Sequence, residues 1–410
     1  MPDRIDLSIE ITRRRFLAGS ALAGFAAFLS ACGTQGTGAT ATAGAATLPP
    51  GTASTTAEPS VGVRATPSAE LNWANWCCYL DVDTADDTKW KTLEDFQAAN
   101  GTVVNYQEVI DENEGFVASI SNQIKNSQDP GWDIIVVTDW MVARLVRLGW
   151  VEEFDLANMP NYVANVRDIY KSQQWDAGMN HHAPWQTGMT GIGYDPTVTG
   201  VLTSVKSLFT VDPRWKGKTE FLTEMRDAVG LAMLAAGTDP RTPTREGCDK
   251  AVELMQKAKS DGIVRDVKGN AYTEDLSSGD AVLCMAWSGD IVTLTDTPSV
   301  KFLFPDEGVM FWTDNCVIPK GAAHKGTAEL MIDYCYVPEH AAQVEAGVAY
   351  ITPVKGVQEI FAASADNKAL ATDPLRFPPA ELEPKLVQFG ILNEADEAYF
   401  NEQFAKVIGV

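Results

Sequence analysis

The sequence is poor in basic residues and in histidine. Its 410 residues contain 32 Lys and Arg against 55 Asp and Glu, and only four His, for a formal net charge of −23. Nucleic-acid binding needs basic patches, so this composition argues against it. An acidic protein attracts cations toward its surface, although the same charge also serves solubility.

The sequence also lacks the short motifs of common enzymes. It contains no H-E-x-x-H, G-x-S-x-G or phosphate-loop pattern. The adjacent His181 and His182 would face apart on a strand, which argues against a metal site. Ser288 has no base partner that the sequence indicates. We therefore expect neither catalysis nor a cofactor or metal.

Long hydrophobic runs are missing too. The apolar run at residues 18–29 has about a dozen residues, whereas a bilayer-spanning helix needs about 20. Arg13 and Arg14 precede this run, which is typical of a twin-arginine export signal. The stretch Leu29-Ser30-Ala31-Cys32 after it resembles the lipobox of bacterial lipoproteins. We expect residues 1–32 to be the signal and Cys32 to carry the lipid.

Composition divides the rest of the chain into two parts. Residues 33–69 are mostly Thr, Ala, Gly, Ser and Pro, a mixture that cannot bury a core and that predicts a flexible stalk. Residues 70–410 have a globular composition, long enough for two lobes. The protein is thus expected to be tethered to the outer face of the cytoplasmic membrane, on its periplasmic or extracellular side.

The cysteines other than Cys32 have no C-x-x-C spacing, which argues against a redox or zinc site of that type. The adjacent Cys77 and Cys78 cannot easily adopt normal disulfide geometry. One or two disulfides are compatible with an exported protein, but spacing does not fix their pairing among Cys77, Cys78, Cys248, Cys284, Cys316 and Cys335.

Short apolar runs alternate with helical patterns in the globular part. This alternation predicts parallel α/β sheets, and two α/β lobes are the simplest arrangement for this length. The predicted strands are 71–76, 103–109, 132–137, 281–286, 301–304 and 315–318. The predicted helices are 88–100, 114–127, 140–148, 226–236, 245–260, 326–336 and 396–407.

Aromatic and acidic residues recur where these strands end. Trp312 and Asp314 are two residues apart in an extended stretch, so both side chains point to one face. An indole and a carboxylate together attract an organic cation. Ligands in open α/β sheets bind beyond the carboxyl ends of strands. The recurrence of aromatic and acidic residues at several strand ends therefore predicts a single ligand site formed by them together. The others are Trp76 and Tyr79, Thr138 and Trp140, Glu224 and Asp227, and Trp287.

The chain resembles the bacterial spermidine/putrescine-binding proteins from about Leu71 to about Pro353. The resemblance rests on an ordered series of short motifs. They are Asn75-Trp76-x-x-Tyr79, Asp133–Val137 with Thr138–Trp140, Gly191–Tyr194, Trp215–Gly217, Met225–Asp227, Trp287–Gly289, Pro305–Gly308, Phe311-Trp312-x-Asp314 and Tyr350–Pro353.

The resemblance implies a site in which aromatic rings line a polyamine chain. It implies that Asp314 grips one amine and that Glu224 and Asp227 hold the amine at the other end. The implied ligand residues are Trp76, Tyr79, Thr138, Trp140, Glu224, Asp227, Trp287, Trp312, Asp314 and Tyr350.

The sequence departs from the family pattern at four positions. The family often has Asp at 224 and Glu at 227, and more commonly Tyr at 140. A glutamine that contacts the ligand near the carboxyl end has only a poor match in Gln388. These departures leave the identity of the polyamine open.

The resemblance also implies a periplasmic-binding-protein-like fold of two lobes joined by a hinge. We expect residues 70–187 and 312–357 in one lobe and 188–311 and 358–410 in the other. A monomeric receptor of this kind closes on its ligand and docks on a membrane permease served by a cytoplasmic ATPase. The competing hypotheses are a receptor of the same architecture for a sugar or an iron complex, and, more remotely, an exported enzyme.

Overall fold

The computed structural model describes residues 64–409, apart from residues 84, 85, 87, 111, 172, 293, 295, 296 and 298. The predicted signal, its lipidated Cys32 and the stalk up to residue 63 lie outside the described residues. The chain from Arg64 onward forms one compact unit. Within the described residues, no helix combines the length and the apolar character that a membrane span requires.

The described chain begins with a segment attached to the folded body, although the sequence predicted a flexible stalk up to residue 69. The Arg64 guanidinium lies 2.8 Å from the carboxylate of Asp333, whose side chain is fully buried. The backbone N–H of Ala65 donates to Asn158, and that of Ser68 donates to Thr327. A buried carboxylate needs a charged or hydrogen-bonding partner, and Arg64 supplies one. Low hydrophobicity of the segment gave no sign of this anchor.

A ten-stranded mixed sheet organises the described chain, in the order β2-β1-β3-β9-β4-β7-β5-β6, with β10 paired to β9 and β8 to β4. β1 is parallel to β2 and β3, and β5 is parallel to β6 and β7. The strands are β1 (Glu70–Trp76), β2 (Val103–Ile110), β3 (Ile134–Thr138), β4 (Ala183–Tyr194), β5 (Thr219–Leu222), β6 (Val264–Lys268), β7 (Leu283–Trp287), β8 (Lys301–Leu303), β9 (Val309–Val317) and β10 (Leu386–Val387).

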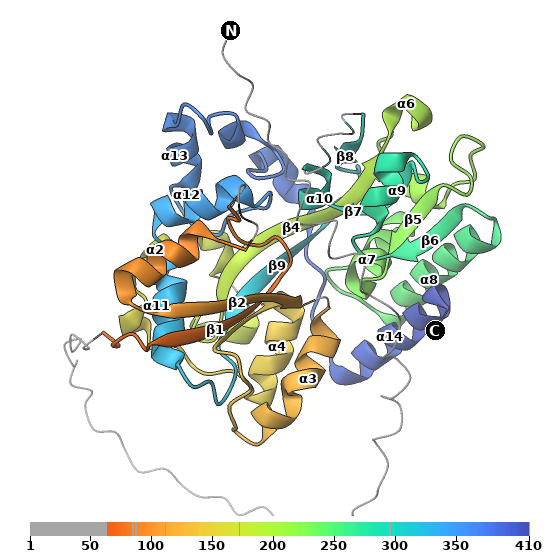
Figure 1. Ribbon diagram of the computed structural model, residues 1–410. Helices are drawn as coiled ribbons and strands as arrows, with labels where there is room; N and C mark the ends of the chain where they lie inside the picture. The colour runs from red at the N-terminus through yellow and green to blue at the C-terminus, as the bar shows by residue number, and fades with distance from the viewer. Residues whose placement is uncertain are drawn as a thin grey trace, which may run out of the picture. The chain divides into compact units, whose positions relative to one another are not determined.

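The predicted α/β class is confirmed, and the parallel pairs lie at the two ends of the sheet. Its centre is antiparallel, because β9 runs opposite to both β3 and β4, and β4 runs opposite to β7. Figure 1 shows β4 and β9 as long strands that connect the two ends. Ile134 to Val137 of β3 are fully buried, as expected of a strand covered on both faces.

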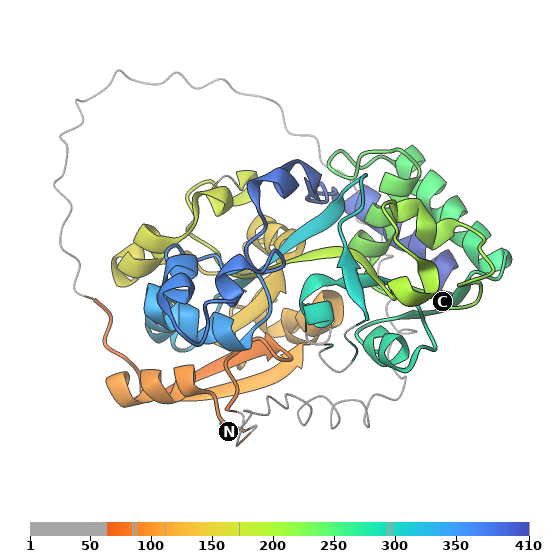
Figure 2. The ribbon, with the colours of Figure 1, turned by 90° about the horizontal axis from the view of Figure 1, so that it is seen from above.

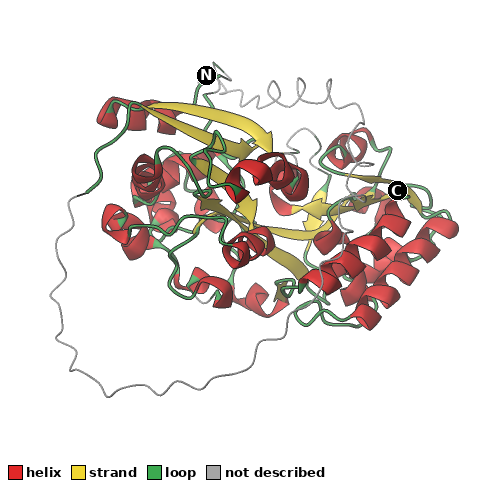
Figure 3. Cartoon of the chain, turned by 90° about the horizontal axis from the view of Figure 1, so that it is seen from below, coloured by secondary structure: helices red, strands yellow, loops and turns green. Residues whose placement is uncertain are grey.

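Helices flank both ends of the sheet (Figures 1 and 3). α4 ends where Gly149 adopts φ +66, a left-handed helix cap. The helices are α2 (Lys91–Asn100), α3 (Asn113–Lys125), α4 (Asp139–Leu148), α5 (Pro160–Asn165), α6 (Pro196–Thr199), α7 (Met225–Ala235), α8 (Arg245–Ser260), α9 (Tyr272–Ser278), α10 (Ser288–Val292), α11 (Lys325–Cys335), α12 (Pro338–Gly347), α13 (Val357–Ala363) and α14 (Glu394–Ile408).

The hydrophobic core is divided between the two ends of the sheet. One cluster joins β5 and β7 with α7, α8 and α14, and Figure 2 shows α8 and α14 gathered at that end. Two further clusters join β1 and β3 with α4 and α11. A small cluster of Met189, Val309 and Ile351 lies on β4, on β9 and beside them. Separate cores on either side of one long strand pair are the architecture that two lobes require.

The segment after residue 357 packs differently from the lobe limits that we expected. Val357 and Phe361 of α13, and Ala371 after it, belong to the cluster of β1 and α11. The chain joins the other cluster at Val387 in β10. The apolar positions of α13 show that it needs a core, but they do not show which of the two cores it joins.

Candidate functional site

Asp314 is a buried acid at the centre of the sheet, only 4% exposed. It lies opposite Thr138 of β3 in the antiparallel pairing. The Thr138 hydroxyl donates to Asp314 Oδ1 at 2.7 Å, and the Tyr79 hydroxyl donates to Oδ2 at 2.8 Å. Burial raises the pKa of Asp314 to about 7, against these two hydrogen bonds, and the charges of Asp139 and Asp227 add to the rise.

Asp227 is a second buried acid, 6% exposed, in the first turn of α7. It accepts a 2.8 Å hydrogen bond from the Thr190 hydroxyl and another of 2.8 Å from Trp287 Nε1. Trp312 Nε1 in turn donates to the Thr190 oxygen at 2.9 Å. Burial raises the pKa of Asp227 to about 6, and the charge of Asp139 contributes. Trp287 therefore contacts Asp227 directly, and Trp312 is linked to it through Thr190.

Glu224 is the predicted acid with the fewest interactions. It precedes α7 and is partly buried. Within the described part of the chain, its carboxylate accepts no hydrogen bond and faces no ion-pair partner within 4.0 Å. Burial raises the pKa of Glu224 to about 8, with a further contribution from the charge of Asp227. Such a group is poised to take a proton or a cationic ligand.

Asp139 is a fourth acid of this cluster that we did not predict. It is 7% exposed, at the start of α4, and burial raises its pKa. Gln388 Nε2 donates to Asp139 Oδ2 at 2.7 Å, and the backbone N–H of Trp140 donates to Oδ1. Its place between Thr138 and Trp140 was the available signal. Gln388, which matched the family pattern poorly, therefore reaches this cluster through Asp139.

Three aromatic rings form a wall beside Asp314. The Tyr350 ring centroid lies 5.3 Å from that of Tyr79 and 5.6 Å from that of Trp312. Two glycines make room for this wall, because a Cβ on Gly188 would collide with the Trp312 indole and one on Gly289 with the Tyr350 ring. The predicted Tyr79, Trp312 and Tyr350 are therefore brought together with Asp314.

The structure places Trp76 and Trp140 in other contacts. Trp76 Nε1 donates to the Val136 carbonyl at 3.0 Å, and its ring packs against the core clusters. The face of Trp140 is covered by the Arg226 guanidinium, 3.7 Å from the ring centroid. Spacing placed both residues at strand ends, but it did not reveal which groups would cover their rings.

Arg226 is the basic residue whose charge lowers the pKa of both Glu224 and Asp227. Its guanidinium also pairs with Glu397 of α14, and Arg144 of α4 lies 2.7 Å from the same carboxylate. Its charge is thus shared with an acid outside the cluster. Burial raises the pKa of each of the four acids, and the charge of a neighbouring acid adds to the rise at Glu224, Asp227 and Asp314. The cluster therefore favours a cation from outside.

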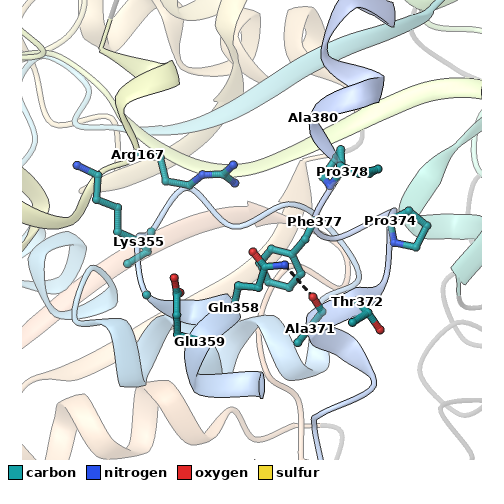
Figure 4. Close-up of a pocket in the computed structure, with 13 residues that line it drawn as sticks. Arg167, Lys355, Gln358, Glu359, Ala371, Thr372, Pro374, Phe377, Pro378 and Ala380 are labelled. Atoms are coloured by element: carbon teal, nitrogen blue, oxygen red, sulfur yellow. Dashed lines mark hydrogen bonds between the residues drawn. The ribbon is translucent and has the colours of Figure 1, made fainter. Parts of the chain in front are cut away.

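One cavity of the described chain lies elsewhere. It has a volume of about 680 Å³ and contains none of these acids. Figure 4 shows Arg167 and Lys355 at this cavity, and the Gln358 side chain donates to the Ala371 carbonyl at 2.8 Å. Its remaining lining comes mainly from the segment 371–380. The burial of Asp139, Asp227 and Asp314 agrees with a site that is closed in this structure.

Comparisons with known proteins find similarity to bacterial solute-binding proteins. A family model for bacterial extracellular solute-binding proteins matches residues 91–378. Spermidine/putrescine-binding periplasmic protein 1 of Haemophilus influenzae is 24% identical over 293 residues, covering 71% of this chain and 78% of that protein. The putrescine-binding periplasmic protein SpuD of Pseudomonas aeruginosa is 24% identical over 355 residues, covering 82% of this chain and 91% of that protein.

Two solved structures show how widely this fold is used. The spermidine/putrescine ABC transporter substrate-binding protein PotD of Streptococcus pneumoniae has a TM-score of 0.68 at 20% identity, covering 83% of this chain and 98% of that one. The Atu4243-GABA receptor has a TM-score of 0.64 at 16% identity, covering 82% and 97%. The predicted two-lobed fold is thus confirmed. The fold alone does not choose the ligand, which the side chains of the site must decide.

Proposed function

Because the chain belongs to the bacterial extracellular solute-binding proteins, we propose that it is the polyamine receptor of an ABC importer. The observation that carries this proposal is the cluster of Asp139, Glu224, Asp227 and Asp314, whose burial raises the pKa of every member. A polyamine supplies two or more ammonium groups joined by methylenes. It would neutralise these acids and cover the aromatic wall at the same time.

The acids divide into two ends of the proposed site. Asp314, held by Tyr79 and Thr138, would take one ammonium group. Glu224 and Asp227 would take the ammonium group at the other end. The methylenes between them would lie against the rings of Trp312, Tyr350 and Trp287, because burial of apolar surface adds about 0.8 kcal/mol per CH₂ group. The spacing of the two ends would select ligand length.

The acid ends come from the two halves of the molecule, which supports closure as the binding step. Tyr79 and Thr138 belong to the half built on β1 and β3, and Asp227 and Trp287 to the half built on β5 and β7. We propose that the lobes part on either side of the central β4 and β9. The first lobe would keep the segment to about residue 377, and the second would resume at β10.

The export and partner assignments complete the proposal. Periplasmic relatives support an exported protein. We propose that Cys32 carries a lipid, that the receptor is a monomer, and that its closed form delivers the ligand to a permease coupled to a cytoplasmic ATPase. These steps extend the family assignment and rest on the predicted signal.

The discriminating experiment is calorimetric titration of the protein with spermidine and putrescine, beside a thermal-shift panel of other solutes. The panel contains GABA, maltose and ferric citrate. GABA tests the ammonium–carboxylate ligand of the related receptor, and the other two test a sugar and an iron complex. We expect stabilisation by a polyamine and none by the other three. Stabilisation by one of those three without any polyamine effect would overturn the proposal.

A further inference from the structure

Two adjacent cysteines, Cys77 and Cys78, lie in the turn after β1, and both are half-buried. Their sulfur atoms are 2.7 Å apart. Adjacent side chains on a regular strand point to opposite faces, so this proximity needs another backbone conformation. Cys78 supplies it with φ +63, a region that residues other than glycine adopt uncommonly. The turn therefore brings two thiol groups to the same side.

Glu108 of β2 holds this turn from the neighbouring strand. Its carboxylate accepts a 3.0 Å hydrogen bond from the backbone N–H of Cys78. It also accepts a hydrogen bond from the Cys77 side chain. An anion beside a thiol disfavours the thiolate, which is the reactive form. Glu108 thus keeps the pair as thiols until an oxidant reaches this partly exposed turn.

We propose that Cys77 and Cys78 are a redox-active pair that closes reversibly into a vicinal disulfide. Exported proteins meet oxidising surroundings, which supply small-molecule or protein disulfides as oxidants. Both thiols lose their protons and together give two electrons to such a disulfide, which leaves as two thiols. Neighbouring Cα atoms are about 3.8 Å apart, whereas the usual disulfide spans about 4.4–6.8 Å. The small ring is therefore strained, and strained disulfides are readily reduced.

The pair lies between two anchored aromatic residues, Trp76 and Tyr79, and Tyr79 belongs to the proposed site. Trp76 before it is tied to β3 through the Val136 carbonyl. Tyr79 after it is tied through its own carbonyl, which accepts from Trp185 Nε1 at 3.2 Å, and its hydroxyl donates to Asp314. A covalent ring between these anchors restricts the turn that presents Tyr79. Reduction of the ring should therefore weaken ligand binding. This consequence rests on the proposed function, whereas the formation of the ring is independent of it.

The first experiment tests ring formation without any ligand. The full-length protein is incubated with oxidised glutathione or with dithiothreitol, alkylated with iodoacetamide in denaturant, and digested for mass spectrometry. After oxidation, the peptide with Cys77 and Cys78 should lack two hydrogens and carry no alkyl group; after reduction it should carry two. The peptide with Cys248, which is fully buried, should be alkylated in both samples. Full alkylation of the pair after oxidation, a glutathione adduct alone, or a covalent dimer would overturn the proposal.

The second experiment measures spermidine affinity of the oxidised and reduced protein. We expect reduction to weaken binding about fivefold, the order expected when an immobilised side chain is released. The Cys77→Ser variant should bind equally under both conditions. Equal affinity of the two wild-type forms would remove the link to Tyr79. If spermidine binds neither form, the proposed function fails, and the mass spectra still decide whether the ring exists.

Discussion

Replacement of Asp314 by Asn should stabilise the ligand-free protein at alkaline pH. The folded state raises the pKa of Asp314 from 3.8 to about 7, mainly through burial. At about 1.4 kcal/mol per pKa unit, ionisation of this acid costs the folded state about 4 kcal/mol above pH 7. This cost is absent when the pH lies below the pKa of Asp314 in the unfolded state, and it grows as the pH rises to its pKa in the folded state. Ionisation of Asp314 therefore lowers the free energy of unfolding at high pH.

The Asn variant avoids this cost because its amide is never charged. It should lose about 1 kcal/mol from the altered hydrogen bonds of Tyr79 and Thr138. The expected net gain is about 2–3 kcal/mol at pH 8, and it falls with pH to a net loss of about 1 kcal/mol below the unfolded pKa, where the ionisation cost is absent. The same substitution leaves an ammonium group unpaired, which should weaken polyamine binding by about 2–5 kcal/mol, or at least about thirtyfold in Kd.

The assay is chemical denaturation of both proteins at pH 5 and pH 8, with calorimetric titration of spermidine or putrescine at pH 8. Asp333→Asn is the matched control. That buried acid accepts from Arg64 and Asn161, so its replacement should destabilise the protein and leave ligand affinity unchanged. An Asp314→Asn variant that is less stable than wild type at pH 8, or that binds polyamine normally, would refute the reasoning.

Three further predictions follow from the same geometry. Polyamine affinity should fall about tenfold between pH 8 and pH 6 from protonation of Asp314 alone, because its pKa of about 7 must drop when it pairs with an ammonium group; titrations in buffers of different ionisation enthalpy should show proton release, and a flat pH profile would contradict this. Gly289→Ala should push the Tyr350 ring out of its place and cost about 1–3 kcal/mol of stability, measured by denaturation, with reduced affinity; an unchanged variant would show that the ring moves freely. Cys32→Ser should release the protein from the membrane fraction into the soluble exported fraction, as judged by fractionation, and continued membrane association would argue against the lipid anchor.

The predicted residues that the structure brings together are those whose neighbours are local or lie at strand ends. Trp312 and Asp314 share a strand, so periodicity sufficed to relate them, whereas the end of a buried strand marked Thr138 without its pairing to Asp314. Trp140 shows the limit of such reasoning. Its ring is covered by Arg226, a residue far away in sequence, and only the packing of α4 against α7 decides that contact.

The central strand β4 was missed for a physical reason. Residues 183–194 include Gly188, Gly191 and Gly193, and glycine is depleted in strands. Each of these glycines gives up a side chain to accommodate a neighbour, which for Gly188 is the Trp312 indole. Close packing at the site requires glycine at these positions, so β4 lacks the side chains by which a strand is usually predicted from sequence. The antiparallel centre of the sheet was therefore hidden, although the parallel ends were predicted.

The long pairing of β4 with β9 connects the two halves of the molecule and can twist when they move. Its ladder keeps Gly188 opposite Trp312 and Thr187 opposite Thr313, and sliding would break many hydrogen bonds together. Twisting costs less at Gly188 and Met189, where the described pairing of β4 is with β9 and not with β7, because two-stranded ribbons tolerate a wide range of twist. Motion of the two halves should therefore wind and unwind this ribbon without changing its register. Trp312 and Asp314 lie on β9 itself, so the proposed ligand would bind to the strand whose twist changes as the two halves move.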